Sequence, residues 1–446
     1  MDVLPGVSMT APRLARVAGL LLLLGVWPSC GDYYRPVATP IAPTQPNPAF
    51  THLAVVINGN GAANPGSSTT IDVSGDSAVS QSTVGLVPVH AALLQGGTRV
   101  YVANSQEDTV STFSPGIATP VSTIPLPSGC GTPPCSKPDF VAGTEFLTVY
   151  VANSASSTVS AISTIDNVVT NTIPVGVNPV AMAETPDQQK LYVANAGSNG
   201  TGGSVTSINT IDKSVNPPVV NGTWISPVWV VARSDSQMVY VLDQGTGNVS
   251  AIDPASNTVV NSVPVGAGAD FMVYDPTLNR LYVTNPAAGT VTCINAATDA
   301  LVVPPVAVAN AVSVAALPDG TRVYVSSAAV SAGTVTSQVT VLNTASLSVK
   351  TTIPLTAVPA VCATRTHSEL FMAAAADSSR VYVGNCDAGN TAVIQTSDDT
   401  LVLQVPAPLS AQAPTAPVNG ECPNRQLPKN GICIAPQNPV FVLAGP

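Results

Sequence analysis

One short stretch, Leu191-Tyr192-Val193-Ala194-Asn195, constrains the fold of this chain most, because close copies of it return along the whole sequence. Eight copies can be counted, and successive copies lie 42 to 58 residues apart. A period of roughly 40 to 50 residues of strand-rich sequence is typical of propeller blades. The chain is therefore expected to repeat one strand-rich unit around a common centre. The copies begin at Val55, Tyr101, Tyr150, Tyr192, Tyr240, Tyr282, Tyr324 and Tyr382.

The unit at residues 178–219 shows how one repeat is expected to fold. A short apolar run at 179–183 is followed by a turn at 185–188 and then by the tyrosine motif. Residues 204–208 alternate hydroxyl and apolar side chains, as a half-buried strand does, and a last strand follows the turn at 209–213. The pattern predicts four strands per unit, A to D in chain order, and an all-β fold.

The two ends of the chain indicate a closed ring. The first unit has strands B, C and D but no strand A, since a proline-rich segment stands in its place. Residues 438–446 parallel 178–186, with Asn, Pro, Val and a closing Pro at matching positions. We predict a β-propeller in which residues 438–444 supply the missing strand, so that no sheet edge is left open. Eight blades are favoured; because the seventh copy ends in Ser327, seven blades with an appended hairpin are the alternative.

The repeats resemble those of the YVTN-family β-propeller proteins. The consensus Tyr-Val-Thr-Asn stands at residues 282–285, and Tyr-Val-Ala-Asn occurs three times. The likeness covers about residues 53–446. It implies an extracytoplasmic propeller, usually of seven blades, from a family in which most members have no established activity.

The amino terminus has the pattern of an export signal. Arg13 and Arg16 precede an apolar run at 17–26 that is too short to span a bilayer. The run ends near Cys30 in a stretch that resembles a bacterial lipobox, so Cys30 is the predicted lipid attachment residue; an ordinary cleaved signal is the alternative. We expect a signal peptide at residues 1–29, a proline-rich tether at 30–50 and the propeller at 51–446.

This organisation predicts a protein of the bacterial cell envelope that meets the membrane through a lipid anchor only, at the outer membrane or the cell surface. The formal net charge is −10 and no basic cluster occurs, so nucleic acid is not expected as a partner. A monomer is expected. Five of the repeats carry Lys or Arg two residues before the tyrosine; these are expected to be solvated turn ends, and a ring of ligand-binding cations is the alternative. They are Arg99, Lys190, Arg280, Arg322 and Arg380.

The connections between strands differ in length on the two faces of the ring. Strand direction alternates, so A–B and C–D turns share one face, here called the turn face, and B–C and D–A connections share the other, the loop face. The long insertions all belong to the loop face, which is therefore the expected binding surface. They lie at residues 59–68, 127–137, 196–203, 327–337, 356–369 and 407–437.

Seven cysteines follow Cys30. In an exported chain their spacing favours disulfides, although a metal site is the alternative. Cys293 is left alone in a C strand, where other repeats carry Ala or Ser, and is expected to be a buried small residue. We predict no metal and no cofactor. The expected pairs bring together Cys130 with Cys135, Cys362 with Cys386, and Cys422 with Cys433.

Few residues could act in catalysis. Asp139 and Asp270 stand at the same count after the start of an A strand, and A strands line a propeller's axis, so both are candidate contacts at the channel mouth together with His90. His52 is expected near the opposite face from His90 and His367.

The predicted function is an exported binding or scaffold module for an envelope protein or a glycan, held through the loop face. A lactonase-like hydrolase using Asp139, Asp270 and His90 is one alternative, and a surface-coat protein is another.

Overall fold

The computed structural model describes residues 53–94, 96–116, 121–127, 133–143, 147–360, 362, 370–410, 427–429 and 432–445. The predicted signal, tether and Cys30 lie outside these residues. The chain divides into residues 1–46 and 47–446, and every strand belongs to the second unit. Over the described part, no helix is long and apolar enough to cross a membrane.

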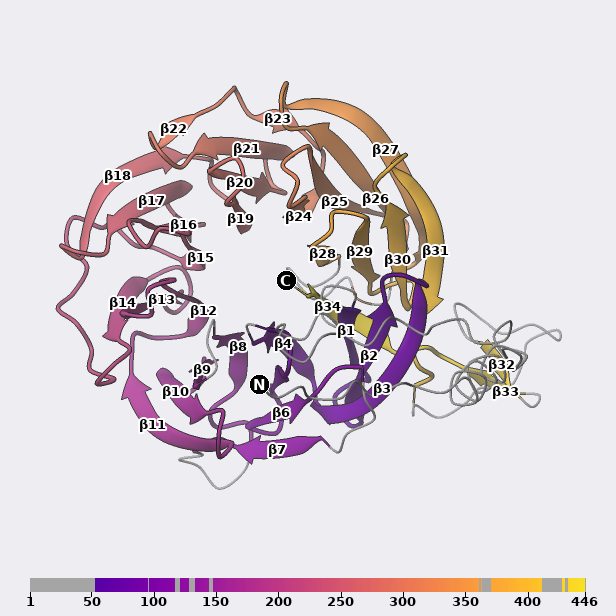
Figure 1. Ribbon diagram of the computed structural model, residues 1–446, viewed down its shortest axis with the longest axis horizontal. Coiled ribbons are helices and arrows are strands. Elements are labelled where there is room, and N and C mark those ends of the chain that lie inside the picture. Colours follow the sequence, from indigo (N-terminus) through magenta and orange to yellow (C-terminus); the bar gives the residue numbers. More distant parts are fainter. Residues whose placement is uncertain are drawn as a thin grey trace, which may run out of the picture. The chain divides into compact units, whose positions relative to one another are not determined.

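The described residues form eight blades in a closed ring (Figure 1). The blades are numbered 1 to 8 in the chain order of their B strands, so that blade 1 contains β1 and blade 8 contains β29. The inner A strands are β34 (Asn438–Ala444), β4 (Pro88–Leu93), β8 (Pro138–Ala142), β12 (Pro179–Glu184), β15 (Pro227–Ala232), β19 (Phe271–Asp275), β24 (Ala311–Ala316) and β28 (Met372–Ala374). The B strands, which carry the tyrosine motif, are β1 (Leu53–Gly59), β5 (Val100–Asn104), β9 (Thr148–Asn153), β13 (Lys190–Asn195), β16 (Val239–Asp243), β20 (Arg280–Asn285), β25 (Arg322–Ser331) and β29 (Arg380–Asn385).

The C strands are β2 (Pro65–Asp72), β6 (Thr109–Phe113), β10 (Thr158–Ser163), β14 (Ser204–Asn209), β17 (Asn248–Asp253), β21 (Thr290–Asn295), β26 (Thr334–Asn343) and β30 (Asn390–Gln395). The outer D strands are β3 (Ser77–Leu86), β7 (Ser122–Pro125), β11 (Val168–Pro174), β18 (Thr258–Pro264), β22 (Ala300–Leu301) with β23 (Val306–Ala307), β27 (Ser348–Pro359) and β31 (Thr400–Pro406). A separate pair, β32 (Leu427–Lys429) and β33 (Ile432–Ile434), lies within the predicted 407–437 insertion.

Outer strands are weakened where two prolines follow one another. In blade 4 a single bridge, Ile208 to Val215, stands where a D strand would pair, and Pro217-Pro218 come next. In blade 6 the outer strand is split into β22 and β23 on either side of Pro304-Pro305. Proline has no N–H to donate to the ladder, so a strand cannot run through such a pair.

The carboxyl-terminal strand closes the ring, as the sequence predicts. β34 pairs antiparallel with β1 along its length, from Ala54–Ala444 to Gly59–Asn438. The Gly445 N–H then donates to the Leu53 carbonyl at 3.0 Å. Blade 1 is thus built from both ends of the propeller, and β34 covers the edge that β1 would otherwise leave open.

The motif tyrosines join each blade to the next on the turn face. Their side chains are at most 1% exposed, and most of the hydroxyls meet one position of the following blade's C–D turn. The residue at that position always has a positive φ, between 49° and 62°, a conformation that Asn and Asp tolerate better than most residues. The pairs are Tyr101–Asn167, Tyr150–Lys213, Tyr192–Asn257, Tyr240–Asp299, Tyr324–Asp399 and Tyr382–Asp76, and together they form the tyrosine belt.

One tyrosine of the belt lacks its partner. Leu347 occupies the matching position after Tyr282 and has no polar atom in its side chain. The buried Tyr282 hydroxyl has no hydrogen-bond partner among the described residues. The junction between blades 6 and 7 therefore lacks the tyrosine hydrogen bond that the other junctions of the belt have.

The basic residues before the tyrosines are part of the same belt, so the expectation of solvated turn ends was wrong. Arg99 donates to the Thr164 carbonyl and Arg280 to the Thr344 carbonyl, each at 2.7 Å. Both carbonyls belong to the C–D turn of the next blade. Arg380 donates through Nε to both carboxylate oxygens of Asp76 at 3.1 Å. Each side chain is partly buried because it crosses a blade junction.

One predicted insertion is a strand hairpin. At residues 327–337, β25 and β26 continue their pairing to Ser331–Thr334. The turn residues Ala332 and Gly333 both have positive φ, 48° and 78°, the geometry of a tight two-residue hairpin turn. The B, C and D strands of blade 7, namely β25, β26 and β27, are therefore longer than those of blades 6 and 8.

Candidate functional site: an axial pocket above a ring of aromatic side chains

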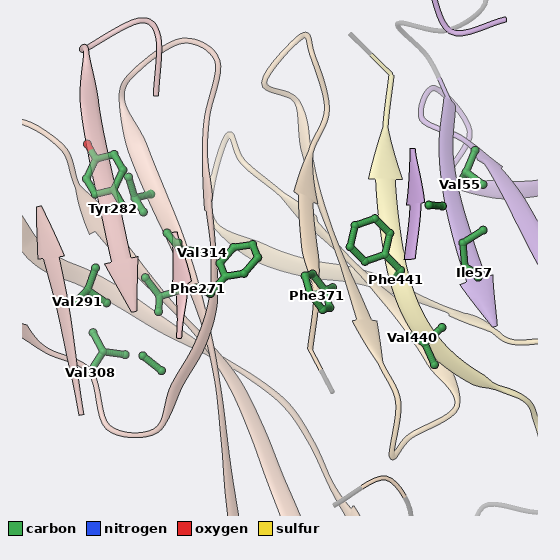
Figure 2. Packing of buried hydrophobic residues seen from close by; sticks show 14 of the residues in the cluster. Val55, Ile57, Phe271, Tyr282, Val291, Val308, Val314, Phe371, Val440 and Phe441 are labelled. Carbon is green, nitrogen blue, oxygen red and sulfur yellow. The ribbon is translucent and has the colours of Figure 1, made fainter. Parts of the chain in front are cut away.

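Six aromatic side chains from six blades meet around the axis, five of them on A strands and one, Phe371, directly before β28. Their rings contact one another in a closed cycle, with centroid separations of 3.8, 5.7, 4.5, 5.4, 4.8 and 4.2 Å. Figure 2 shows three of them, Phe271, Phe371 and Phe441, which follow one another around the axis although blade 7 lies between the blades of Phe271 and Phe371. In order around the cycle this axial ring consists of His90, Phe140, Trp229, Phe271, Phe371 and Phe441.

The axial ring occupies one equivalent position of the repeat. Each member stands opposite the third residue of the tyrosine motif, as His90 opposite Ala103 and Phe271 opposite Thr284. A register shift just before the residue, between Pro88 and His90 for example, bends the strand there. The other two blades carry small residues at this position, Ala181 and Ser313, and leave room for the six larger rings.

A cavity of about 610 Å³ lies over the axial ring and is called the axial pocket. Five ring members form its floor, namely His90, Phe140, Trp229, Phe271 and Phe371. Its mouth is lined by residues of D–A connections and by residues that directly follow B strands, so the pocket opens on the loop face. The mouth residues include Lys137, Asn178, Ser226, Ser105, Ala196 and Gln244.

The pocket brings together the three residues that the sequence singles out, because Asp139, Asp270 and His90 all line it. The two aspartates directly precede axial ring members in blades 3 and 6. Asp139 pairs with Lys137 at 3.3 Å, and Asp270, 9% exposed, accepts a hydrogen bond from the Gln244 amide at 3.1 Å. At the same position four other blades carry valines that line the pocket, namely Val89, Val180, Val228 and Val440.

His90 acts as an aromatic ring of the floor. Its Nδ1 accepts the Val141 N–H at 3.3 Å, and its ring stacks on Phe140 at 3.8 Å. Burial lowers the pKa of His90 to about 3, because the protonated ring would lose its hydration. His90 is therefore neutral at physiological pH. His52 and His367 lie outside the described residues.

One predicted disulfide is confirmed. Cys362 and Cys386 are joined with an Sγ–Sγ distance of 2.09 Å, and the Cys362 N–H donates to Asp387 at 2.7 Å. Cys293 is free and buried, as expected, and burial raises the pKa of its thiol to about 12. Cys135 is disulfide-bonded, while Cys130 and Cys422 lie outside the described residues, as does the side chain of Cys433. No cluster of three potential metal ligands occurs within the described ranges.

Sequence reasoning missed most of the axial ring, although a signal was present. The chain has only seven phenylalanines and three tryptophans, and five of these ten residues stand at the axial ring position. The enrichment becomes visible only when the repeats are aligned on the strand opposite the tyrosine motif. The aspartates were predicted because they are charged residues at the same count after the start of an A strand, whereas the aromatic residues resemble ordinary core.

No protein-family description and no curated protein sequence matches the chain. Solved structures of similar fold include AztD from Citrobacter koseri, with 10% identity and a TM-score of 0.59 over 89% of this chain and 98% of that one. A putative 6-phosphogluconolactonase from Bacteroides uniformis is similar with 13% identity and a TM-score of 0.51, over 88% and 98%. At these identities the likeness supports the β-propeller fold alone.

Proposed function

We propose that this chain is an exported binding module that holds an envelope protein or a glycan through its loop face, with the axial pocket as the centre of the contact. The observation that carries the proposal is the coincidence of the pocket with the predicted face. The polar residues that depart from the repeat, Asp139 and Asp270, also lie there. Rigid scaffolds place binding groups in this way, on connections above a repeated core.

The YVTN resemblance and the lipobox-like stretch extend the proposal to the cell envelope. A lipid on Cys30 and the proline-rich tether would hold the propeller at a membrane surface. The check is metabolic labelling with a radioactive fatty acid: the wild-type protein takes up label and the Cys30→Ser variant does not. Equal labelling of both proteins contradicts the anchor.

The hydrolase alternative gains no specific support from the pocket. It would use His90 with Asp139 and Asp270, but His90 already accepts a backbone N–H and its low pKa makes it a weak base. The structures named as lactonases share the fold at 13% identity or less. The binding role therefore remains the proposal.

A matched pair of tryptophan substitutions tests the binding face. Ala196 lines the mouth of the pocket, and Ala345 is an exposed residue of a C–D turn on the turn face. Immobilised full-length wild-type protein is offered envelope material, split into a protease-treated and a glycosidase-treated fraction. We expect Ala196→Trp to lose capture while Ala345→Trp retains it, with similar melting temperatures for both. Capture that survives Ala196→Trp would refute the loop-face proposal.

A further inference from the structure

The walls and floor of the axial pocket differ in chemistry from its mouth. The floor consists of aromatic rings, and the level just above it carries four valines and two aspartates. One ammonium group accompanies the two carboxylates, that of Lys137 at the mouth of the pocket, which pairs with Asp139. The formal charge of these groups is therefore −1, inside a chain whose net charge is −10. The pocket combines an apolar well with a negative field.

We propose that the axial pocket binds an organic cation, an alkylated ammonium group carried on the ligand of the loop face. The inference rests on the proposed function and names the chemistry that the same site recognises. Aromatic rings attract cations through their negative π-faces, and the attraction grows when the cation is desolvated. The Asp139 and Asp270 carboxylates supply opposite charge on the walls.

The floor is suited to a cation because none of its members carries positive charge. His90 is buried among Phe140 and Phe441, at centroid distances of 3.8 and 4.2 Å, and stays neutral there. A protonated histidine in the same place would repel an ammonium group. Trp229, the ring type that attracts cations most strongly, is the one partly exposed member of the five floor residues, and the other four are buried.

The valine level argues against a neutral sugar as the deeply bound group. A pyranose lowered onto the floor would place hydroxyl groups against Val89, Val180 and Val228, which cannot accept or donate hydrogen bonds. Burying a hydroxyl without a hydrogen-bond partner is unfavourable, because the group gives up its hydrogen bonds to water. The methyl groups of an alkylated ammonium fit the same valines without that cost. The volume of about 610 Å³ exceeds one such group, so part of the attached ligand enters with it.

The test compares choline with its uncharged carbon isostere, 3,3-dimethylbutan-1-ol, by isothermal titration calorimetry on the full-length protein. The two probes have nearly the same shape, so a difference in affinity measures the charge. We expect choline to bind about tenfold or more tightly than the alcohol. Equal affinities, or binding of glucose in preference to choline, would overturn the inference. Absence of choline binding would also overturn it, even where the capture experiment with Ala196→Trp supports the loop face.

Matched variants locate the site. Asp270→Asn removes a carboxylate charge but keeps the oxygen that accepts from Gln244, so the variant is expected to fold and to bind choline about tenfold more weakly. Asp166→Asn, at an exposed turn-face residue, removes the same charge elsewhere and should leave choline affinity unchanged. Affinity for the uncharged alcohol should not change in either variant. Equal loss in both variants would assign the effect to the overall field rather than to the pocket.

Discussion

The tyrosine belt and the axial pocket are built on the same repeat but use it in opposite ways. In the belt the residue types recur, so that Tyr192 and Asn257 make the contact that Tyr101 and Asn167 make elsewhere. At the pocket the types depart from the repeat, with Asp139 and Asp270 where other blades carry valine. The difference teaches that repeated polar residues here hold blades together, whereas polar residues that break the repeat mark the candidate site.

The largest loss of folding stability is expected from a substitution in the floor of the pocket. Phe271 packs between Trp229 and Phe371, with centroid distances of 4.5 and 5.4 Å, and is 8% exposed. Phe271→Ala should lower the free energy of unfolding by about 3–5 kcal/mol, because it leaves a cavity on the axis. The neighbouring Asp270→Asn should cost less than about 1 kcal/mol. Denaturant unfolding of both variants measures the two free energies. Similar losses of stability would contradict the view that Phe271 holds the fold together while Asp270 does not.

The second-largest loss of stability is expected at the most highly charged contact of the tyrosine belt. The Asp399 carboxylate, whose side chain is 1% exposed, binds Arg322, Tyr324 and Lys350, the last at 2.5 Å. Asp399→Asn should destabilise the fold by about 2 kcal/mol, since three donors lose a charged acceptor. The control is Asp398→Asn, at the exposed neighbouring residue, which should stay within about 0.5 kcal/mol of wild type. Chemical denaturation distinguishes the two, and equal stabilities would remove Asp399 from the belt.

The same carboxylate predicts a pH dependence. Burial alone would raise the pKa of Asp399, but hydrogen bonds from Lys350, Tyr324 and Arg322 outweigh it and hold the pKa below its usual range. A depressed pKa in the folded state means that the contact contributes stability above the unfolded pKa of about 3.9 and loses it as pH falls further. The stability gap between wild type and Asp399→Asn should therefore narrow on acidification below about pH 5. A stability difference between wild type and Asp399→Asn that widens in acid would contradict a lowered pKa of Asp399.

The smallest effect uses the tyrosine that has no partner. Tyr192→Phe removes a hydroxyl that donates to Asn257 at 3.0 Å and should cost about 1 kcal/mol. Tyr282→Phe removes a buried hydroxyl without a partner and should cost nothing or stabilise slightly. Thermal unfolding of the pair provides the comparison. Equal losses would show that the belt hydrogen bonds do not contribute as described.

The sequence was sufficient for the architecture because the architecture is what repeats. The motif at Tyr192, its copies and the segment at residues 438–444 predicted eight blades and their closure, and both are confirmed. Contacts between blades could not be read in the same way. The partner of Tyr192 lies 65 residues away in the next blade's turn, and a solvated turn end looks identical in sequence to Arg99, which crosses a junction.

The candidate site was predictable only in part, for the same reason. Asp139 and Asp270 are visible as departures from a repeated valine, and they do line one pocket. Phe140 and Phe371 are apolar residues at an A-strand position, and only the curvature of the ring makes them neighbours of Trp229 and Phe271. A contact of this kind depends on the number of blades and their radius, which no local pattern contains.

The most direct test applies one substitution, aspartate to asparagine, to both regions and titrates each folded variant with choline. Asp270→Asn should lose about tenfold in affinity, whereas Asp399→Asn, in the tyrosine belt, should bind as wild type does at a pH where it is folded. That outcome supports a division between residues that hold the ring together and residues that meet the ligand. Equal choline affinities for the two variants, or a lower choline affinity for Asp399→Asn than for Asp270→Asn, would contradict it.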